Sequence, residues 1–302
     1  MTPRIRRIAI IAERGFVPPG ALRFPYSRLM TETLVRDALA EDGADNDITG
    51  LATVVSDRRI RCSMVARQAG VIAGIALARE AFRQRNPRAA VRTAVKDGQH
   101  VAAGTPVMFV TGHPRGLLSA ERVALNYMQR LSGIATLTAE FVRAVEGTEA
   151  RILDTRKTTP GWRRLEKYAV RAGGGMNHRM DLASAILIKD NHLAALDGDV
   201  GLAIDLSRST APKNTLIEIE CDNLDQVRVA VDHGADIILL DNMSNDDLVD
   251  AVELIRGRAV TEASGGVNLG TVRAIAETGV DWISVGALTH SAKAMDLALD
   301  FE

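Results

Sequence analysis

Cations and glycines are concentrated between residues 154 and 192, where eight Lys or Arg residues and two His residues accompany a Gly173-Gly174-Gly175 run. Two short apolar segments, 151–153 and 185–188, bound this stretch and have the composition of strands. α/β enzymes place their chemistry where strands end and loops begin. The cations at such places, which no helix face accounts for, are Arg156, Lys157, His178, Arg179 and Lys189. The stretch therefore predicts a site that binds anions.

Three further cations of this stretch, Arg163, Lys167 and Arg171, are four residues apart, and Glu166 stands among them. This spacing puts them on one face of a helix, which is ordinary for a helix exposed to solvent. We therefore expect a solvated helix here and leave these residues out of the site.

Carboxylates form a second candidate group. Glu218 and Glu220 alternate with Ile, so both face one side of a strand, where burying them without a cation is costly. Asp241 closes the next apolar strand, and Glu220 lies nearer its own strand end than Glu218 does. Glu220 and Asp241 are thus predicted oxygen ligands of Mg²⁺, with a role for Glu218 left open. The alternative is a lattice of salt bridges with Lys and Arg from neighbouring strands.

Glycines follow the last two predicted strands. Ser264-Gly265-Gly266 comes after the strand that ends at Glu262, and Gly286 and His290 come after the last strand. Glycine lets backbone N–H groups approach a phosphate, and barrels commonly build phosphate sites in these loops. These residues are therefore candidate phosphate ligands, and simple turns are the alternative.

The strands and helices that must position these cations, carboxylates and glycines form a repeat of strand followed by helix. Short apolar strands begin near Arg151, Ala185, Thr215, Asp236, Ala259 and Asp281, with amphipathic helical stretches between them. This is the βα pattern of a parallel sheet or barrel, in which the strand ends converge on one rim. Six strands are clear and one more can be hidden, so the pattern predicts an incomplete barrel of about seven strands.

A different pattern precedes this repeat. Strands are expected at 59–66, 91–95 and 107–110, and helices at 27–41 and 74–85. Residues 117–145 predict a long helix or two helices with a joint at Ser132-Gly133. The fold class is α/β, with a small α+β open-sheet domain at 1–130, to which a C-terminal helix at 291–302 can be added, and a barrel domain at 131–290. Pro18-Pro19-Gly20 predicts a loosely packed leader over residues 1–25.

Composition restricts the partners. The chain has 302 residues, 46% apolar, with a net charge of −1, which argues against a general polyanion binder such as a nucleic-acid-binding protein. Two distant cysteines predict no disulfide framework and a reducing compartment. Apolar runs are too short for a membrane span, so we expect a cytoplasmic protein without membrane contact.

Three motifs, taken in this order and spacing, resemble those of the quinolinate phosphoribosyltransferase family. They are Asp154-Thr155-Arg156-Lys157-Thr158, Asn177-His178-Arg179 after the glycine run, and Leu187 to His192. The resemblance extends from about Tyr26 to the C-terminus. It implies an open seven-stranded barrel and transfer of the phosphoribosyl group of 5-phosphoribosyl 1-pyrophosphate to quinolinate, with loss of CO₂, in NAD biosynthesis.

The resemblance also implies roles for single residues. It places Arg156, His178, Arg179 and Lys189 around the two carboxylates of quinolinate and Lys157 near the pyrophosphate. Arg122, from the Glu-Arg pair before Leu125-Asn126, is then lent by one subunit of a homodimer or higher oligomer to its partner's site. Lys157, Glu220 and Asp241 are the predicted catalytic residues, and Mg²⁺ is the predicted cofactor.

Three other functions are compatible with parts of the pattern. Lys189 on a barrel strand could form a Schiff base, as in aldolases, although the surrounding cations and the acid pair have no place in that chemistry. A non-catalytic protein could hold a phosphorylated ligand without a need for Glu220 and Asp241. A nicotinate phosphoribosyltransferase would need cations for one carboxylate, so the excess of cations favours a dicarboxylate.

Overall fold

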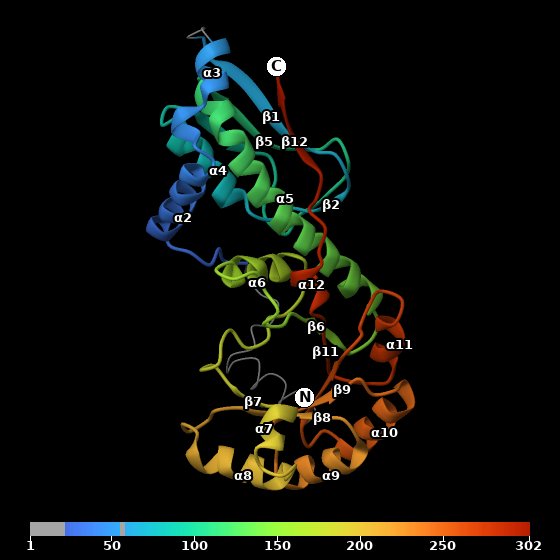
Figure 1. Cartoon of the computed structure of the whole chain (residues 1–302). Helices are drawn as coiled ribbons and strands as arrows, with labels where there is room; N and C mark the ends of the chain where they lie inside the picture. Colours follow the sequence, from blue (N-terminus) through green and yellow to red (C-terminus); the bar gives the residue numbers. More distant parts are fainter. Residues whose placement is uncertain (1–21, 55–57) are drawn as a thin grey trace. The chain divides into compact units, whose positions relative to one another are not determined.

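The computed structural model describes residues 22–54 and 58–302, which form two compact units. The barrel unit contains residues 140–163 and 175–291, and the N-terminal unit contains residues 22–54, 58–139, 164–174 and 292–302 (Figure 1). Nearly all of the predicted leader at 1–25 lies outside the described residues.

The barrel unit is built on a parallel sheet. Its strands are β6 (Arg151–Leu153), β7 (Ile186–Ile188), β8 (Ile217–Cys221), β9 (Ile237–Asp241), β10 (Val260–Ser264) and β11 (Trp282–Ser284), in the order β6-β11-β10-β9-β8-β7. Met176 forms an isolated parallel bridge with Leu153 on β6 and so occupies a seventh strand position. The prediction of an incomplete barrel of about seven strands is confirmed.

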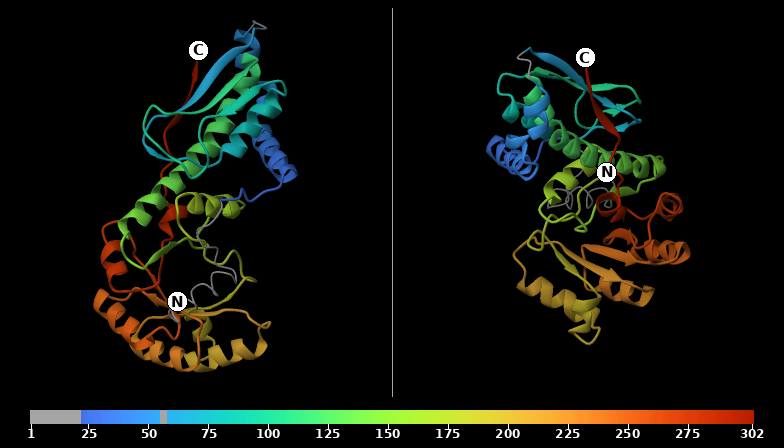
Figure 2. Two further views of the ribbon diagram at one scale, coloured as in Figure 1. Left: turned by 180° about the vertical axis from the view of Figure 1, so that it is seen from behind. Right: turned by 45° about the horizontal axis from the view of Figure 1, so that its top comes forward.

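The helices that follow strands β7 to β11 are α7 (Asp190–Ala194), α8 (Val200–Thr210), α9 (Leu224–Asp232), α10 (Asn245–Ile255), α11 (Val272–Glu277) and α12 (Ala287–His290). α8, α9 and α10 pack side by side against β7 to β10 (Figure 2). Side chains at their N-caps fix where these helices begin, because Asp199, Asn223 and Ser244 each accept a hydrogen bond from a first-turn N–H.

Alternation along the strands decides which residues face the helices. On β8, Ile217, Ile219 and Cys221 are fully buried, and Glu218 and Glu220 point to the opposite, inner side. The register pairs Glu220 on β8 and Glu262 on β10 with the same residue of β9, Leu239, so the two carboxylates lie on the same face of the sheet. The apolar core of the unit is formed by Leu153, Met176, Ala185, Leu216, Ile237, Val260 and Trp282.

The N-terminal unit contains an antiparallel sheet with helices. Its strands are β1 (Ile60–Ala66), β3 (Ala90–Thr93), β5 (Pro106–Gly112) and β12 (Leu297–Phe301), in the order β12-β1-β5-β3, together with a small pair of β2 (Gly70–Val71) and β4 (His100–Val101). Its helical segments are α2 (Arg28–Glu41), η1 (Ala44–Asn46), α3 (Ile48–Thr53), α4 (Ile75–Arg85), most of α5 (Pro114–Ala144) and α6 (Arg163–Ala172).

The C-terminal helix predicted at 291–302 is wrong. Residues 297–301 form β12, which pairs antiparallel with β1 from Cys62 opposite Phe301 to Ala66 opposite Leu297. Leu297 and Leu299 are buried, and Ala298 between them is less so, which is the period of a strand. The ladder with β1 outweighs the helix propensity of Ala and Leu in this segment.

α6 is not the solvated helix that its spacing predicts. Glu166 is completely buried, and Arg130 on α5 binds its carboxylate through Nη2 at 2.7 Å and Nε at 3.2 Å. Lys167 is also buried, with only 1% of its surface exposed. Tyr168 donates a hydrogen bond of 2.6 Å to Asp97. Charge spacing on a helix cannot distinguish a solvated face from one that meets buried partners.

α5 is one continuous helix, without the joint predicted at Ser132-Gly133. Ser132 instead accepts a hydrogen bond of 3.0 Å from the N–H of Ala73. A Cβ added at Gly133 would overlap the carbonyl oxygen of Lys293. Gly133 is therefore explained by the close approach of the C-terminal segment, and not by a break in the helix.

Replacing Gly133 by Ala should lower the stability of the N-terminal unit. An exposed helical Gly→Ala change gains roughly 1 kcal/mol, but here the added methyl group must displace backbone, and such overpacking costs about 1–3 kcal/mol. The urea midpoint of the far-ultraviolet circular dichroism signal would measure the change. A midpoint equal to or above that of the unchanged protein would contradict the close approach.

Candidate active site

Asp154, directly after β6, organises the loop that carries several of the predicted cations. Its buried carboxylate accepts hydrogen bonds from the Asn177 amide at 2.6 Å and from the backbone N–H of His178 at 2.9 Å. The Met176 bridge holds the same segment against β6. The sequence motif contains Asp154, but its part in positioning residues 177–179 was not predicted.

The His178 imidazole is buried and held on both sides. Nδ1 accepts the backbone N–H of Arg179 at 2.8 Å, and Nε2 lies 3.2 Å from Oε1 of Glu218 and 3.5 Å from Oε1 of Glu262. The structure thus puts Glu218 in a group with His178 and Glu262, apart from the group that contains Glu220. The predicted contact of His178 with substrate stays a prediction.

Glu262 on β10 was not predicted as a site residue. It is completely buried and accepts a hydrogen bond of 2.6 Å from the Ser284 hydroxyl on β11. The pKa of Glu262 is raised from its ordinary value of 4.5 to about 7. Burial is the main cause and the Glu218 charge adds to it, while His178, Ser284 and Lys189 oppose the shift. An acidic residue on an inward-facing strand position is the sequence signal that could have identified it.

The raised pKa predicts how stability depends on pH. The folded protein binds the Glu262 proton more tightly than the unfolded chain does, so this contribution is fully present below about pH 4.5 and is lost as pH rises through about 7. The loss is at most on the order of 3 kcal/mol. Urea unfolding should therefore show declining stability between about pH 5 and about pH 8, and a smaller decline for Glu262→Gln. Parallel profiles for the two proteins would refute this assignment.

Arg156 and Arg179 are close enough for their charges to interact. Arg179 is buried and donates from Nη1 to the carbonyl of Ala185 at 2.9 Å. Burial lowers the pKa of Arg179 and the charge of Arg156 lowers it further, while Glu218 and Asp181 oppose the shift. Among the described residues, the buried Nε–H groups of Arg156 and Arg179 meet no acceptor. Because an unpaired buried donor is costly, both guanidinium groups are suited to an anionic ligand.

The predicted metal ligands lie together at the ends of β8 and β9. Glu220, Asp241 and the exposed Asp222 each have a carboxylate oxygen within 4.8 Å of the others. Oxygen donors of this kind suit Mg²⁺. Lys189, after β7, forms an ion pair with Glu220, so a predicted substrate ligand and a predicted metal ligand contact each other directly. Asp222 was missed because it follows its strand by one residue.

The first predicted phosphate loop lies beside this carboxylate group. The Ser264 carbonyl accepts the N–H of Asn242 at 2.9 Å, and the Asn242 side chain donates to Asp241 at 2.6 Å. Gly265 has a φ of +97°, and a Cβ there would overlap Asn242. Gly266, with a φ of +58°, follows it. Only glycine fits position 265, because both its backbone conformation and its space exclude a side chain.

The second predicted phosphate loop lies beside Lys157. A Cβ added at Gly286 would lie 3.1 Å from Nε2 of His290 and 3.1 Å from Cδ of Lys157. The Thr289 hydroxyl donates to the carbonyl of Lys157 at 2.7 Å. The residues predicted for the phosphate and for the pyrophosphate are therefore neighbours. α12, which begins after Gly286, is a single turn.

Arg122 belongs to the N-terminal unit. It lies on α5, with its side chain exposed. Its predicted contribution to the site of a second subunit stays a prediction.

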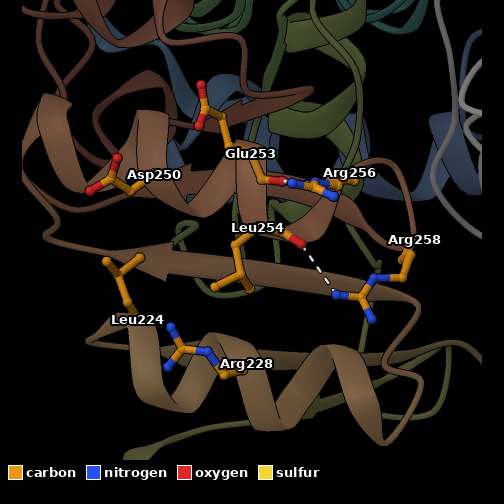
Figure 3. Close-up of a pocket in the computed structure, with 7 residues that line it drawn as sticks. All are labelled: Leu224, Arg228, Asp250, Glu253, Leu254, Arg256 and Arg258. Carbon is orange, nitrogen blue, oxygen red and sulfur yellow. Dashed lines mark hydrogen bonds between the residues drawn. The ribbon is translucent and has the colours of Figure 1, made fainter.

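A surface cavity of about 650 Å³ lies elsewhere, in the outer helical layer of the barrel unit (Figure 3). It is lined by Leu224, Arg228, Asp250, Glu253, Leu254, Arg256 and Arg258. The three arginines donate to neighbouring carboxylates or carbonyls, as in the bond of 3.2 Å from Arg258 to the Leu254 carbonyl. This cavity contains neither the carboxylate group nor the histidine described above, so it does not compete as the candidate active site.

Comparisons with known proteins agree with the motifs. Residues 47–132 match the family model described as quinolinate phosphoribosyl transferase, N-terminal domain, and residues 134–300 match that of the C-terminal domain. A probable nicotinate-nucleotide pyrophosphorylase [carboxylating] of Bacillus subtilis is 40% identical over 91% of this chain and 94% of its own length. The nicotinate-nucleotide pyrophosphorylase [carboxylating] of Mycobacterium leprae is 45% identical over 88% of this chain and 95% of its own length.

A solved structure of a protein with the same kind of name has the same fold. The nicotinate-nucleotide pyrophosphorylase of Francisella tularensis superposes with a TM-score of 0.86 at 38% identity, over 92% of this chain and 98% of the other. No helix among residues 22–54 and 58–302 has both the length and the apolar character to cross a membrane. Family models matching both units, together with relatives of this identity and coverage, show that the chain belongs to the quinolinate phosphoribosyltransferase family.

Proposed function

We propose that this protein transfers the phosphoribosyl group of 5-phosphoribosyl 1-pyrophosphate to quinolinate and releases pyrophosphate and CO₂, which yields nicotinate mononucleotide for NAD biosynthesis. Two observations on the barrel unit carry the proposal: the buried Nε–H groups of Arg156 and Arg179 find no acceptor within the described chain, and Glu220, Asp222 and Asp241 form a carboxylate group that Lys189 contacts. The names of relatives that are 40–45% identical support the same reaction.

The dicarboxylate is assigned to the cations after β6 and β7. Arg156 and Arg179 can each give a carboxylate a charge-assisted hydrogen bond, and Lys189 adds a positive charge at the end of β7. Arg122 of a second subunit would add another cation. Binding both carboxylates fixes the pyridine ring, so its nitrogen can be directed at the anomeric carbon of the ribose.

The phosphoribosyl donor is assigned to the glycine loops and the carboxylates. Ser264, Gly265, Gly266, Gly286 and His290 would hold the ribose phosphate, and Lys157, which is adjacent to Gly286 and His290, would neutralise the pyrophosphate. Glu220 and Asp241, with Asp222, would hold Mg²⁺. When bound, the ion neutralises charge on the leaving pyrophosphate.

In the transfer, the bond from the anomeric carbon to pyrophosphate breaks while the ring nitrogen supplies the electron pair of the new bond. The chain contributes position and fixed charges. The ring of the product is a pyridinium, so the adjacent carbon can keep the electron pair when its carboxylate leaves as CO₂. That carbon then takes a proton. The positive ring supplies the electron sink, so the reaction does not require an organic cofactor.

We further propose a homodimer in which Arg122 completes the partner's site, and a cytoplasmic location. The resemblance of Glu121-Arg122 to the family motif supports the first proposal, and Arg122 is exposed as such a role requires. For the second, Cys62 and Cys221 are both free and buried, and a chain without a disulfide between its cysteines suits a reducing compartment.

The test is an assay for nicotinate mononucleotide from quinolinate, the phosphoribosyl donor and Mg²⁺, compared with nicotinate as the acceptor. We expect quinolinate to be used at least about 100-fold more efficiently, because an acceptor with one carboxylate leaves buried cations unpaired. Equal use of nicotinate would make the protein a nicotinate phosphoribosyltransferase. Covalent trapping of Lys189 by borohydride would indicate Schiff-base chemistry. Ligand binding without turnover and without an effect of Mg²⁺ would indicate a non-catalytic binding protein.

A further inference from the structure

We propose that Glu218 is a positioning residue for quinolinate binding, which acts through His178 on Arg179 and is supported from behind by Glu262 and Ser284. This inference rests on the proposed function, because it assigns Arg179 to the dicarboxylate. The observation behind it is a set of buried contacts that meet at His178. Its Nε2 faces Glu218 on β8 and Glu262 on β10, its Nδ1 binds the backbone of Arg179, and Ser284 on β11 binds Glu262.

The contacts of the imidazole define its protonation. The backbone N–H of Arg179 points at Nδ1 from 2.8 Å, so Nδ1 must offer a lone pair there. The ring proton of a neutral His178 is then on Nε2, which faces Oε1 of Glu218 at 3.2 Å. Glu218, with Glu262 at 3.5 Å as a second carboxylate, therefore stabilises the Nε2–H tautomer, in which Nδ1 can accept the backbone N–H of Arg179.

Arg179 is thereby fixed at two points. Its backbone N–H binds His178, and its Nη1 binds the carbonyl of Ala185 before β7. Its buried Nε–H meets no acceptor within residues 22–54 and 58–302, so this donor is left for an anion. Removing Glu218 should therefore weaken the orientation of this guanidinium.

Glu218 and Glu262 cannot reach the substrate themselves. Both side chains are completely buried, whereas His178 and Arg179 are 6% and 5% exposed. Glu262 keeps one oxygen on Ser284 at 2.6 Å, so its carboxyl group has a fixed place behind His178. Burial of this kind is consistent with action through neighbours and not with direct contact.

Nuclear magnetic resonance of the His178 ring nitrogens tests the tautomer in the whole protein. The chain has six His, and a His178→Gln variant assigns the signal. We expect a protonated Nε2 and an unprotonated Nδ1. In Glu218→Gln the amide oxygen still accepts the proton, so the tautomer should persist. In Glu218→Ala it should be lost.

Steady-state kinetics test the consequence. For Glu218→Ala we expect the KM for quinolinate to rise at least about 10-fold, with the KM for the phosphoribosyl donor changed less than about 3-fold. Glu218→Gln should recover much of the loss. Thr261→Val is a matched control, because Thr261 is buried next to Glu262 on β10, faces the other side and loses a hydrogen bond of 2.9 Å to Asp281. Its KM for quinolinate should stay unchanged.

Several outcomes would overturn the inference. They are a protonated Nδ1 in the unchanged protein, a stoichiometric divalent metal bound to His178, Glu218 and Glu262, or an unchanged KM for quinolinate in a folded Glu218→Ala variant. If Glu218→Ala does not fold, the ring signals of the unchanged protein and of Glu218→Gln still test whether His178 has the proposed tautomer. If the unchanged protein does not convert quinolinate, the proposed function fails, whereas the dependence of the tautomer on Glu218 can still be observed.

Discussion

Replacing Glu220 and Asp241 together by their amides should lower kcat/KM by at least about 1,000-fold, through kcat more than through the KM for quinolinate. Both carboxylates belong to the group whose oxygens lie within 4.8 Å of one another. Amide oxygens carry no charge, so they bind Mg²⁺ weakly and cannot hold it against a charged leaving group. The Glu220 change also removes the partner of Lys189.

Initial rates measured across a Mg²⁺ titration check this prediction. Each single variant should need more Mg²⁺ than the unchanged protein, and the double variant should not reach its rate at any concentration. Asp250→Asn is the control, because Asp250 is an exposed acid of α10 that lines the outer cavity (Figure 3). If the double variant has the rates and the Mg²⁺ dependence of this control, Glu220 and Asp241 do not hold the metal ion of the reaction.

Arg179→Lys should lower kcat/KM for quinolinate by about 100-fold or more, although the charge is kept. Arg179 donates from Nη1 to the Ala185 carbonyl and has a second donor, Nε–H, left for a ligand. A lysine has a single nitrogen, which cannot stand at both positions. The planar guanidinium is what allows one side chain to do both. The effect should appear in the KM for quinolinate, with the KM for the phosphoribosyl donor almost unchanged.

The matched control is Arg228→Lys on α9, whose guanidinium is exposed and paired with Asp225 at 2.9 Å. We expect no change there. If Arg179→Lys binds quinolinate as tightly as this control does, then Arg179 is a structural residue and the dicarboxylate binds elsewhere. Quinolinate titrations by calorimetry would distinguish these results without dependence on turnover.

The carboxylates at the strand ends could be predicted from the sequence. Side chains alternate between the two faces of a strand, and the βα repeat brings the ends of parallel strands to one edge of the sheet. The alternation in Leu216 to Glu220 is sufficient to place both glutamates on one face, and the polar residues after β8 and β9 do meet at one edge. Their separate roles could not be predicted. Glu218 and Glu220 differ through His178 and Lys189, which come from segments far away in sequence.

Other features depend on tertiary contacts that no local pattern encodes. The local sequence of the C-terminal residues favours a helix, but these residues pair with β1 as a strand. Gly133 predicts a break in α5, but it is explained by the close approach of Lys293. Glu166 and Lys167 have the spacing of surface residues, but Arg130 binds Glu166 inside the N-terminal unit. In each case a partner distant in sequence decides the outcome, so the local preference is overridden.

The most direct measurement follows the fate of one carboxylate. Quinolinate labelled in the carboxyl group next to the ring nitrogen is incubated with the phosphoribosyl donor, Mg²⁺ and the protein, and labelled CO₂, pyrophosphate and nicotinate mononucleotide are counted. We expect the three products to appear in equal amounts and no product to form without Mg²⁺. Pyrophosphate released without labelled CO₂, or no reaction of quinolinate at all, would contradict the proposed reaction.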